Sequence, residues 1–134
     1  MIVAIGIDSV EIERFADWAN HPEENLKKIY SDKEIKYCLQ NEKTSAERFA
    51  VRFAAKEAFF KALSHIVPDH EIPFLTVCKN VSTQQEKNGN PNLAINWDFI
   101  SGDYGKNAER NLNTLISLTH TANTATALII IENR

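Results

Sequence analysis

The amino-acid sequence predicts an α+β fold in which helices of the N-terminal half pack on a mainly antiparallel sheet. Helical patterns gather in the first half of the chain, and the longest of them, residues 45–64, contains no glycine or proline. Apolar, β-branched runs separated by turn residues gather in the second half. Because the chain has 134 residues and no repeat or low-complexity linker, we expect a single domain spanning residues 1–134.

The N-terminal segment predicts a strand that leads directly into a helix. Residues 2–7 are apolar and partly β-branched, which indicates a buried strand. Asp8 and Glu11 have the spacing of a capping box, so a helix is expected to open at Asp8 and to run to about Trp18.

Three further helices are predicted in the first half of the chain. Pro22 suits the first turn of a helix that runs to about Tyr30. The sequence Ser31-Asp32-Lys33-Glu34 is a second capping box and predicts a helix that ends near Leu39. The sequence Thr44-Ser45-Ala46-Glu47 has the same form and is expected to cap the long helix.

The second half of the chain predicts strands and turns. A turn signal, Asn88-Gly89-Asn90-Pro91, separates the first two predicted strands, and a short loop at residues 121–123 joins the last two. Residues 98–111 are ambiguous, because their apolar start favours a helix whereas Gly102 and Gly105 weaken it. The four predicted strands are residues 73–79, 93–97, 114–119 and 125–131.

Charge and composition argue against several classes of protein. The net charge of -3 disfavours general nucleic-acid binding, which needs a strongly basic surface. The apolar N-terminal run lacks a basic flank and stops at Asp8, so it predicts neither a signal peptide nor a membrane span. Cys38 and Cys78 match no metal-binding or redox spacing, which favours free thiols in a reducing compartment. We therefore expect a cytoplasmic protein that binds neither nucleic acid nor membrane.

The long helix carries an acidic residue on its apolar face. At about 100° per residue, Glu57 falls between phenylalanine and alanine positions. Lys61 follows at i+4, in the order that favours an ion pair. Glu57 is therefore either a partly buried ion-pair partner or a functional group such as a metal ligand, since carboxylates are seldom buried without a partner or a metal.

Other polar residues carry a structural and a functional interpretation side by side. Arg48, Arg52 and Lys56 share the opposite arc of the long helix, where periodicity favours a solvated basic stripe over a cationic wall for a phosphorylated ligand. Asp8 either caps a helix or holds an ion beside phosphates. His120 follows an apolar run and is more often a satisfied strand-end histidine than a catalyst. Ser117 alone indicates nothing.

Four sequence blocks follow one another along the chain. Residues 5–14 (IGIDSVEIER) and residues 49–63 (FAVRFAAKEAFFKAL) are the first two. Gly89-Asn90-Pro91 is a Gly-x-Pro turn, and residues 115–120 (LISLTH) form a closing strand that ends in histidine. In order and spacing, over essentially the full length, these blocks resemble the holo-acyl-carrier-protein synthase family.

The resemblance implies a 4′-phosphopantetheinyl transferase-like fold and a homotrimer with its sites between neighbouring subunits. The implied reaction transfers 4′-phosphopantetheine from coenzyme A to a serine of apo acyl carrier protein, for fatty acid biosynthesis, and releases 3′,5′-ADP. Mg²⁺ is the implied cofactor, and Glu57 is the first choice for the general base. By resemblance, the metal ligands are Asp8 and Glu57; the catalytic residues are Asp8, Glu57 and Lys61; the coenzyme A contacts are Arg52, Lys61, Ser117 and His120; and Arg14 is the carrier-protein contact.

Two segments depart from the family pattern. Residues 64–69 (SHIVPD) contain no glycine, where many members have a glycine-rich loop. Residues 20–24 (NHPEE) are acidic, where relatives are often basic. Two other functions therefore stay open: a Mg²⁺-dependent phosphohydrolase that uses the same carboxylates, and a non-catalytic coenzyme A-binding domain.

Overall fold

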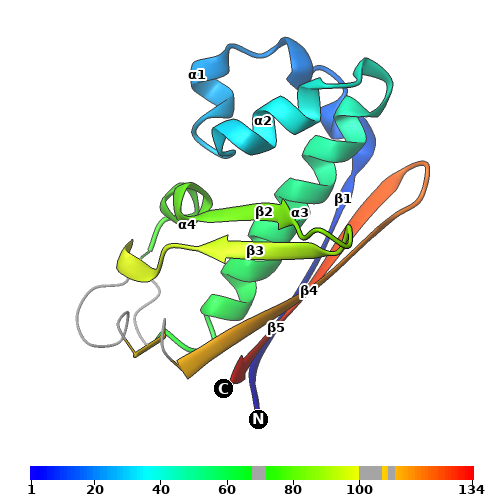
Figure 1. Ribbon diagram of the computed structural model, residues 1–134. Helices are drawn as coiled ribbons and strands as arrows, with labels where there is room; N and C mark the ends of the chain where they lie inside the picture. The colour runs from blue at the N-terminus through cyan, green and yellow to red at the C-terminus, as the bar shows by residue number, and fades with distance from the viewer. Residues whose placement is uncertain (68–71, 100–106, 109–110) are drawn as a thin grey trace.

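The computed structural model describes residues 1–67, 72–99, 107–108 and 111–134. A long helix, α3 (Ser45–Leu63), lies against one face of a three-stranded sheet, and shorter helices gather near its N-terminal end (Figure 1). The two termini lie close together, where the Asn133 amide donates to the Met1 carbonyl at 2.9 Å. This arrangement confirms the predicted α+β class.

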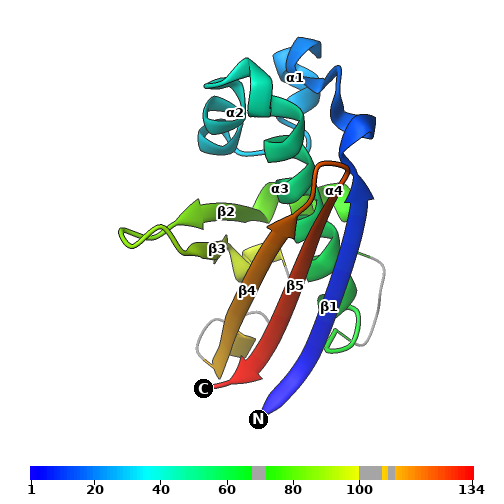
Figure 2. The same ribbon diagram turned by 90° about the vertical axis from the view of Figure 1, so that its right-hand side faces the viewer.

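The three-stranded sheet consists of β1 (Ile2–Glu11), β4 (Leu112–His120) and β5 (Thr124–Asn133). Its order is β1-β5-β4, and both pairs are antiparallel. Figure 2 views the face that α3 leaves uncovered, with the helix behind the strands. The side chains of β5 alternate, so that every second residue from Ala125 to Ile131 is fully buried toward α3. The β4–β5 hairpin was predicted from the sequence, and the structure extends both strands by a few residues.

A close contact between β1 and α3 fixes the position of the sheet against the helix. A Cβ atom added to Gly6 would lie 2.0 Å from the Ala58 carbonyl oxygen and 2.9 Å from the Ala62 nitrogen. Only glycine therefore fits at this point of β1. Asp8 follows two residues later on the same face of the strand and so also points toward α3.

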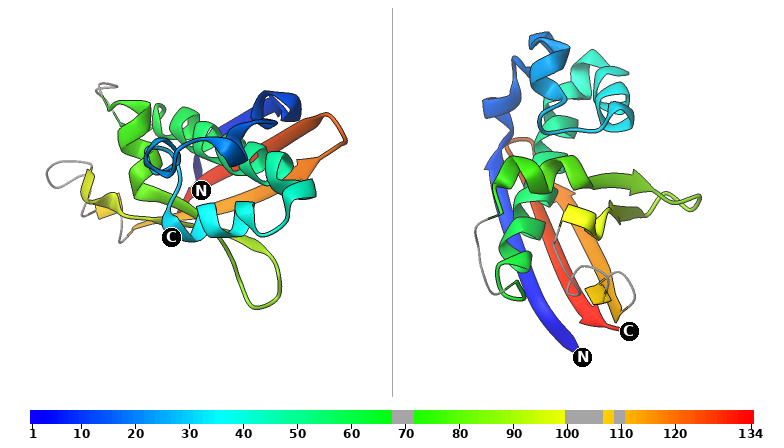
Figure 3. Two further views of the ribbon diagram at one scale, coloured as in Figure 1. Left: turned by 90° about the horizontal axis from the view of Figure 1, so that it is seen from above. Right: turned by 90° about the vertical axis from the view of Figure 1, so that its left-hand side faces the viewer.

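A two-stranded hairpin, β2 (Val81–Gln85) and β3 (Pro91–Ile95), extends away from the rest of the molecule (Figure 3). Gly89 lies in its turn with φ of 85°, in the left-handed region that favours glycine. The turn signal at residues 88–91 is thereby confirmed.

The prediction of a helix that opens at Asp8 is wrong. β1 continues to Glu11, and two short 3-10 helices, η1 (Ile12–Phe15) and η2 (Trp18–Asn20), follow it. Pairing with β5 continues through residues 8–11 of β1, with Asp8 opposite Ala127. Ladder hydrogen bonds and burial on the inner face therefore prevailed over the local capping pattern.

The other helices of the first half agree with the sequence in part. α2 (Asp32–Leu39) begins with the predicted capping box, in which Ser31 and Glu34 bond each other's backbone amides. α1 (Glu23–Leu26) is a single turn and ends well before Tyr30. α3 has the predicted length, but the side chain of Thr44 makes no capping bond and donates to the Asn41 carbonyl instead.

The prediction of a strand at residues 73–79 is wrong. This segment forms a short helix, α4 (Phe74–Asn80), and β2 begins only at Val81. In this helix the side chains of Val77 and Cys78 are buried against the rest of the fold. Tertiary packing therefore overrides the strand propensity of the segment. β3 overlaps the strand predicted at 93–97, although Trp97 begins a 3-10 helix, η4 (Trp97–Phe99). Most of the ambiguous segment, residues 100–106 and 109–110, lies outside the described residues.

Candidate active site

Asp8 is held at the interface of β1 and α3. Its side chain is 8% exposed, and Oδ1 accepts a hydrogen bond of 2.8 Å from Nζ of Lys61 on α3. The same ammonium donates to the Ile7 carbonyl at 3.2 Å. The hydrogen bond from Lys61 to Asp8 raises the pKa of Lys61, so this side chain stays protonated at neutral pH.

Glu57 lies one turn before Lys61 on α3 and is half-buried. Burial raises the pKa of Glu57 above its ordinary value, and the nearby charge of Asp8 raises it further. The charges of Arg14 and Lys61 act in the opposite direction. The two carboxyl groups thus lie close enough to interact, as the resemblance implies.

The donor set of Asp8 and Glu57 fits a magnesium ion. Asp8 Oδ2 is buried and has no hydrogen-bond partner among the described residues, so one carboxylate oxygen is left available. Mg²⁺ is typically bound by one or two carboxylates together with waters and substrate phosphates. In the described part of the chain, no group of three or more His, Cys, Asp or Glu side chains is placed to hold a metal ion.

Arg14 lies in η1, immediately after β1, and not on the helix predicted there. Its guanidinium carbon is 4.9 Å from the centroid of the Phe53 ring and 5.5 Å from that of Phe15. Phe53 belongs to α3, one turn before Glu57. Arg14 therefore borders the carboxylate cluster as well as the N-terminal surface.

The prediction that Arg48, Arg52 and Lys56 form a solvated basic stripe is wrong for Arg52 and Lys56. Lys56 is 0% exposed and Arg52 is 6% exposed. The guanidinium carbon of Arg52 lies 4.2 Å from the centroid of the Tyr37 ring, on α2. Helix α2 and strand β2 cover this side of α3. The basic side chains that helical periodicity places on a solvent-facing side are therefore enclosed.

A pocket of about 260 Å³ opens beside Arg52, between α2, α3 and β2. Lys33, Tyr37 and Thr83 also line it. Arg52 Nε and Thr83 Oγ1 are buried and have no hydrogen-bond partner among the residues that the structure describes. Unpaired polar groups of this kind favour a polar or anionic occupant.

Ser117 and His120 do not share a face of the sheet, because they are three positions apart on one strand and side chains alternate between the two faces. Ser117 lies exposed on the outer face of the sheet, opposite Leu128 of β5. His120 lies at the end of β4, and its Nε2 is 3.1 Å from Oε1 of Glu47 in the first turn of α3. Glu47 and Glu57 are ten residues apart, or about 15 Å along the helix, so His120 lies away from the carboxylate cluster.

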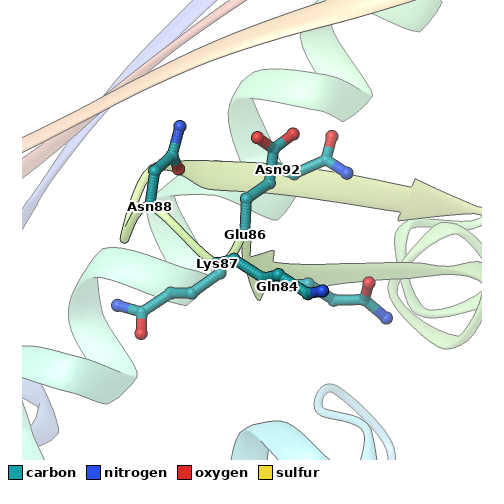
Figure 4. A pocket seen from close by; sticks show the side chains of 6 residues that line it. Gln84, Glu86, Lys87, Asn88 and Asn92 are labelled. Atoms are coloured by element: carbon teal, nitrogen blue, oxygen red, sulfur yellow. The ribbon is translucent and has the colours of Figure 1, made fainter.

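A second polar pocket, of about 570 Å³, is formed by the β2–β3 hairpin alone. In Figure 4, Glu86, Asn88 and Asn92 project to one side of the hairpin, whereas Gln84 and Lys87 lie on the other. These side chains are amides and charged groups with no aromatic ring among them, so the pocket offers hydrogen bonds and no stacking surface.

Two residues near the site were not singled out by the sequence. Glu34 is the buried partner of Lys56, and Glu47 is the partner of His120. Both occupy the last position of a capping box that the sequence predicts, and this local pattern gives no sign of a long-range contact. Spacing along the chain carries no signal for either pair.

Comparison with known proteins shows the family of this chain. The family described as the 4′-phosphopantetheinyl transferase superfamily matches residues 4–120. The holo-[acyl-carrier-protein] synthase of Treponema denticola is 34% identical, over 98% of this chain and 99% of the relative. None of the helices in the described residues is long and apolar enough to cross a membrane.

Two solved structures share the fold. The ACPS–CoA complex of Chronobacterium ammoniagenes has a TM-score of 0.74 and 25% identity, over 98% of this chain and 97% of that one. The Bacillus anthracis holo-(acyl-carrier-protein) synthase in complex with CoA (3′,5′-ADP) has a TM-score of 0.70 and 26% identity, over 100% and 99%. The chain therefore belongs to the 4′-phosphopantetheinyl transferase superfamily, and within it to the holo-acyl-carrier-protein synthase family.

Proposed function

We propose that this chain is a Mg²⁺-dependent enzyme that transfers 4′-phosphopantetheine from coenzyme A to a serine of apo acyl carrier protein. The observation that carries the proposal is the cluster of Asp8, Glu57 and Lys61, in which two carboxyl groups and an ammonium converge from β1 and α3. The names of the relatives support these substrates, since they are holo-acyl-carrier-protein synthases and two of the solved structures are complexes with coenzyme A or its 3′,5′-ADP part.

In the proposed reaction, the serine Oγ attacks the β-phosphorus of coenzyme A and the bond to the bridging oxygen breaks. The serine proton passes to Glu57, and 3′,5′-ADP leaves with the bridging oxygen. Glu57 suits this role because its carboxylate lies beside Asp8 and Lys61 at the same site and can accept a proton there. The Lys61 ammonium offsets the negative charge of the leaving group. A Mg²⁺ ion held by Asp8 and Glu57 would supply Lewis-acid polarisation of the phosphoryl oxygens.

Coenzyme A contacts are proposed for Arg52, Ser117 and His120, beside Lys61. The pocket next to Arg52 supports the first of these, because its unpaired Arg52 Nε and Thr83 Oγ1 would gain partners from a phosphate or an adenine. Ser117 and His120 lie on opposite faces of β4, so a ligand that meets both must lie at the edge of the sheet or between two subunits.

The proposal includes a homotrimer whose sites lie between neighbouring subunits. The number of three subunits rests on the family resemblance. The outer face of the sheet exposes Ile5, Ile7 and Leu115, which are 54%, 58% and 47% exposed. The register places Ile5 and Leu115 opposite Ile130 on either side of β5, so these side chains form one apolar patch. Burying such a patch favours association, and Ser117 on the same face would then meet a neighbouring subunit.

Two further features belong to the proposal. Arg14 would contact the acidic carrier protein, since it lies beside the carboxylate cluster at which the carrier serine must arrive. A cytoplasmic location is also proposed, and it agrees with Cys38 and Cys78 being free and buried.

One assay tests the proposed reaction against its alternatives. The protein is incubated with coenzyme A, Mg²⁺ and an apo acyl carrier protein, and the carrier mass and the nucleotide products are measured. A 4′-phosphopantetheine adduct on the carrier, with one 3′,5′-ADP released per adduct, supports transfer. Cleavage of coenzyme A without an adduct would identify a phosphohydrolase, and intact coenzyme A with measurable binding would identify a non-catalytic binding domain; either result overturns the proposal.

A further inference from the structure

A fully buried ion pair lies on the turn of α3 that carries Glu57. Lys56 Nζ is 2.9 Å from Oε1 of Glu34 on α2, and both side chains are 0% exposed. The same ammonium donates to the carbonyl of Cys78 at 3.1 Å and to the carbonyl of Val81. These three acceptors match the three N–H bonds of the ammonium, so its hydrogen-bonding capacity is filled.

Glu34 extends this network into the neighbouring elements. Its Oε1 accepts a bond of 2.9 Å from the Ser31 amide at the start of α2, and its Oε2 accepts one of 3.1 Å from the Thr83 amide in β2. Cys78 lies in α4 and Val81 opens β2. The pair therefore connects α2, α4 and the hairpin to a single position of α3.

Stability alone is a weak reason for such a pair. Removing two charges from water costs about as much as their attraction returns, and apolar replacements of buried pairs are often as stable. A filled set of directional bonds does, however, hold a side chain in one orientation. What the pair supplies is thus a fixed geometry at this turn of α3.

We propose that Lys56 and Glu34 are positioning residues that fix the direction in which Glu57 projects toward Asp8. Glu57 is the next residue on the helix, so holding position 56 fixes the rotation of α3 at this turn. Carboxylates of a helix lie roughly 5–6 Å from its axis, so a rotation of about 10° would displace Glu57 by about 1 Å. A displacement of about 1 Å can lower a catalytic rate by about 100-fold.

A second contact holds α3 from the side of the sheet. Gly6 of β1 lies against the Ala58 carbonyl, one residue beyond Glu57. The helix is thus held on one side by close backbone packing and on another by the buried ion pair. Asp8 is fixed relative to the first contact, and Glu57 is fixed relative to the second.

The inference rests on the proposed function, and its test compares three variants of the full chain. Lys56→Met removes the ammonium, and Glu34→Gln keeps the shape of the side chain while it removes the charge. Leu26→Ala serves as the control, because Leu26 is buried on α1 and is part of neither the ion-pair network nor the Gly6 contact. Each variant is assayed for transfer at a temperature at which circular dichroism shows that it is folded, with coenzyme A varied and with the carrier protein and Mg²⁺ saturating.

For Lys56→Met and Glu34→Gln we expect kcat to fall by about 10- to 100-fold, while KM for coenzyme A changes by less than about threefold. Binding of Mn²⁺ in the presence of coenzyme A, followed by electron paramagnetic resonance, should weaken in the same variants. Leu26→Ala should lower the melting temperature without either effect. If Lys56→Met does not fold, Glu34→Gln carries the test alone.

Two results would overturn the inference. The first is a Glu34→Gln variant whose kcat and Mn²⁺ binding equal those of the control at similar loss of melting temperature, which would make the pair purely structural. The second is a rise in KM for coenzyme A with kcat unchanged, which would make it part of the ligand site. In both cases the wild-type protein still transfers the group, so failure of the inference is distinct from failure of the proposed function.

Discussion

At the scale of single residues, the site brings the two carboxyl groups of Asp8 and Glu57 close together, with Lys61 and Arg14 as the nearby cations. Burial raises the pKa of Glu57 and the charge of Asp8 raises it further, while Lys61 donates to Oδ1 of Asp8 and to the Ile7 carbonyl. Like charges in a partly buried place destabilise the folded chain, and a bound cation relieves that repulsion. A functional site of this kind lowers the free energy of unfolding of the chain that carries it.

The first prediction concerns the cost of this charge. With its pKa raised on folding, Glu57 favours the folded state when protonated, and this contribution is lost as the pH rises through the raised pKa. In the presence of a chelator, Glu57→Gln should therefore have a higher melting temperature than the wild type at pH 7.5. The difference should shrink as the pH is lowered and the wild-type carboxyl becomes protonated. A variant less stable than the wild type at pH 7.5 would show that the carboxylates do not repel each other.

The second prediction concerns Arg14 and the carrier protein. Arg14→Glu should raise KM for acyl carrier protein more than KM for coenzyme A, because it places a negative charge where an acidic partner docks. Exposed charge contacts contribute only about 0.2–1 kcal/mol each, so reversal of the charge is a sharper probe than truncation. Steady-state kinetics at low and at physiological salt provide the measurement, and Lys27→Glu, at a lysine already paired with Glu23 and Asp32, is the matched control. Unchanged carrier kinetics for Arg14→Glu at low salt would place docking on another surface.

At the scale of elements, the site depends on how closely β1 approaches α3. Gly6 permits that approach, and two residues later Asp8 meets Lys61. The sequence predicted both elements, but it assigned Asp8 to a helix cap because the capping pattern is local and the pairing with β5 is not. For the same reason α4 was predicted as a strand: its burial depends on α3 and η4, which a short window does not contain.

The third prediction concerns Gly6. Gly6→Ala should lower the free energy of unfolding by about 1–3 kcal/mol or more, because the new methyl group overlaps the Ala58 carbonyl oxygen. Gly89→Ala is a useful control, since its new methyl group has open space and only the positive φ costs about 1–2 kcal/mol. Urea unfolding of both variants measures the difference. A Gly6→Ala variant as stable as the wild type would show that β1 can move away from α3 at little cost.

At the scale of the whole molecule, the sheet has one face covered by α3 and one face left open (Figure 2). The structure brings Asp8, Glu57 and Lys61 together, and their roles in the reaction stay a prediction. The resemblance did not indicate that Ser117 faces away from His120, or that Lys56 is enclosed with Glu34, because both depend on the packing of distant segments. That the chain is one domain, and that it forms a trimer, remain predictions.

The fourth prediction concerns assembly through the open face. Leu115→Glu should shift the protein from an oligomer to a monomer, because it places a charge in the apolar patch with Ile5 and Ile7. Leu75→Glu is the matched control, since Leu75 is 45% exposed on α4, away from the sheet. Light scattering at several concentrations measures the mass of each. A wild-type protein that is monomeric and fully active at all of them would refute assembly through this face.

The measurement that tests the central claim most directly is the mass of an apo acyl carrier protein after incubation with coenzyme A, Mg²⁺ and each of three proteins: the wild type, Asp8→Ala and Glu57→Ala. With enzyme in excess over carrier, the account predicts complete conversion to the 4′-phosphopantetheine form by the wild type. It predicts no detectable adduct with either variant, although both keep the far-ultraviolet circular dichroism of the folded chain. Conversion by Asp8→Ala or Glu57→Ala at a rate near that of the wild type would contradict the assignment of these two carboxylates to the reaction.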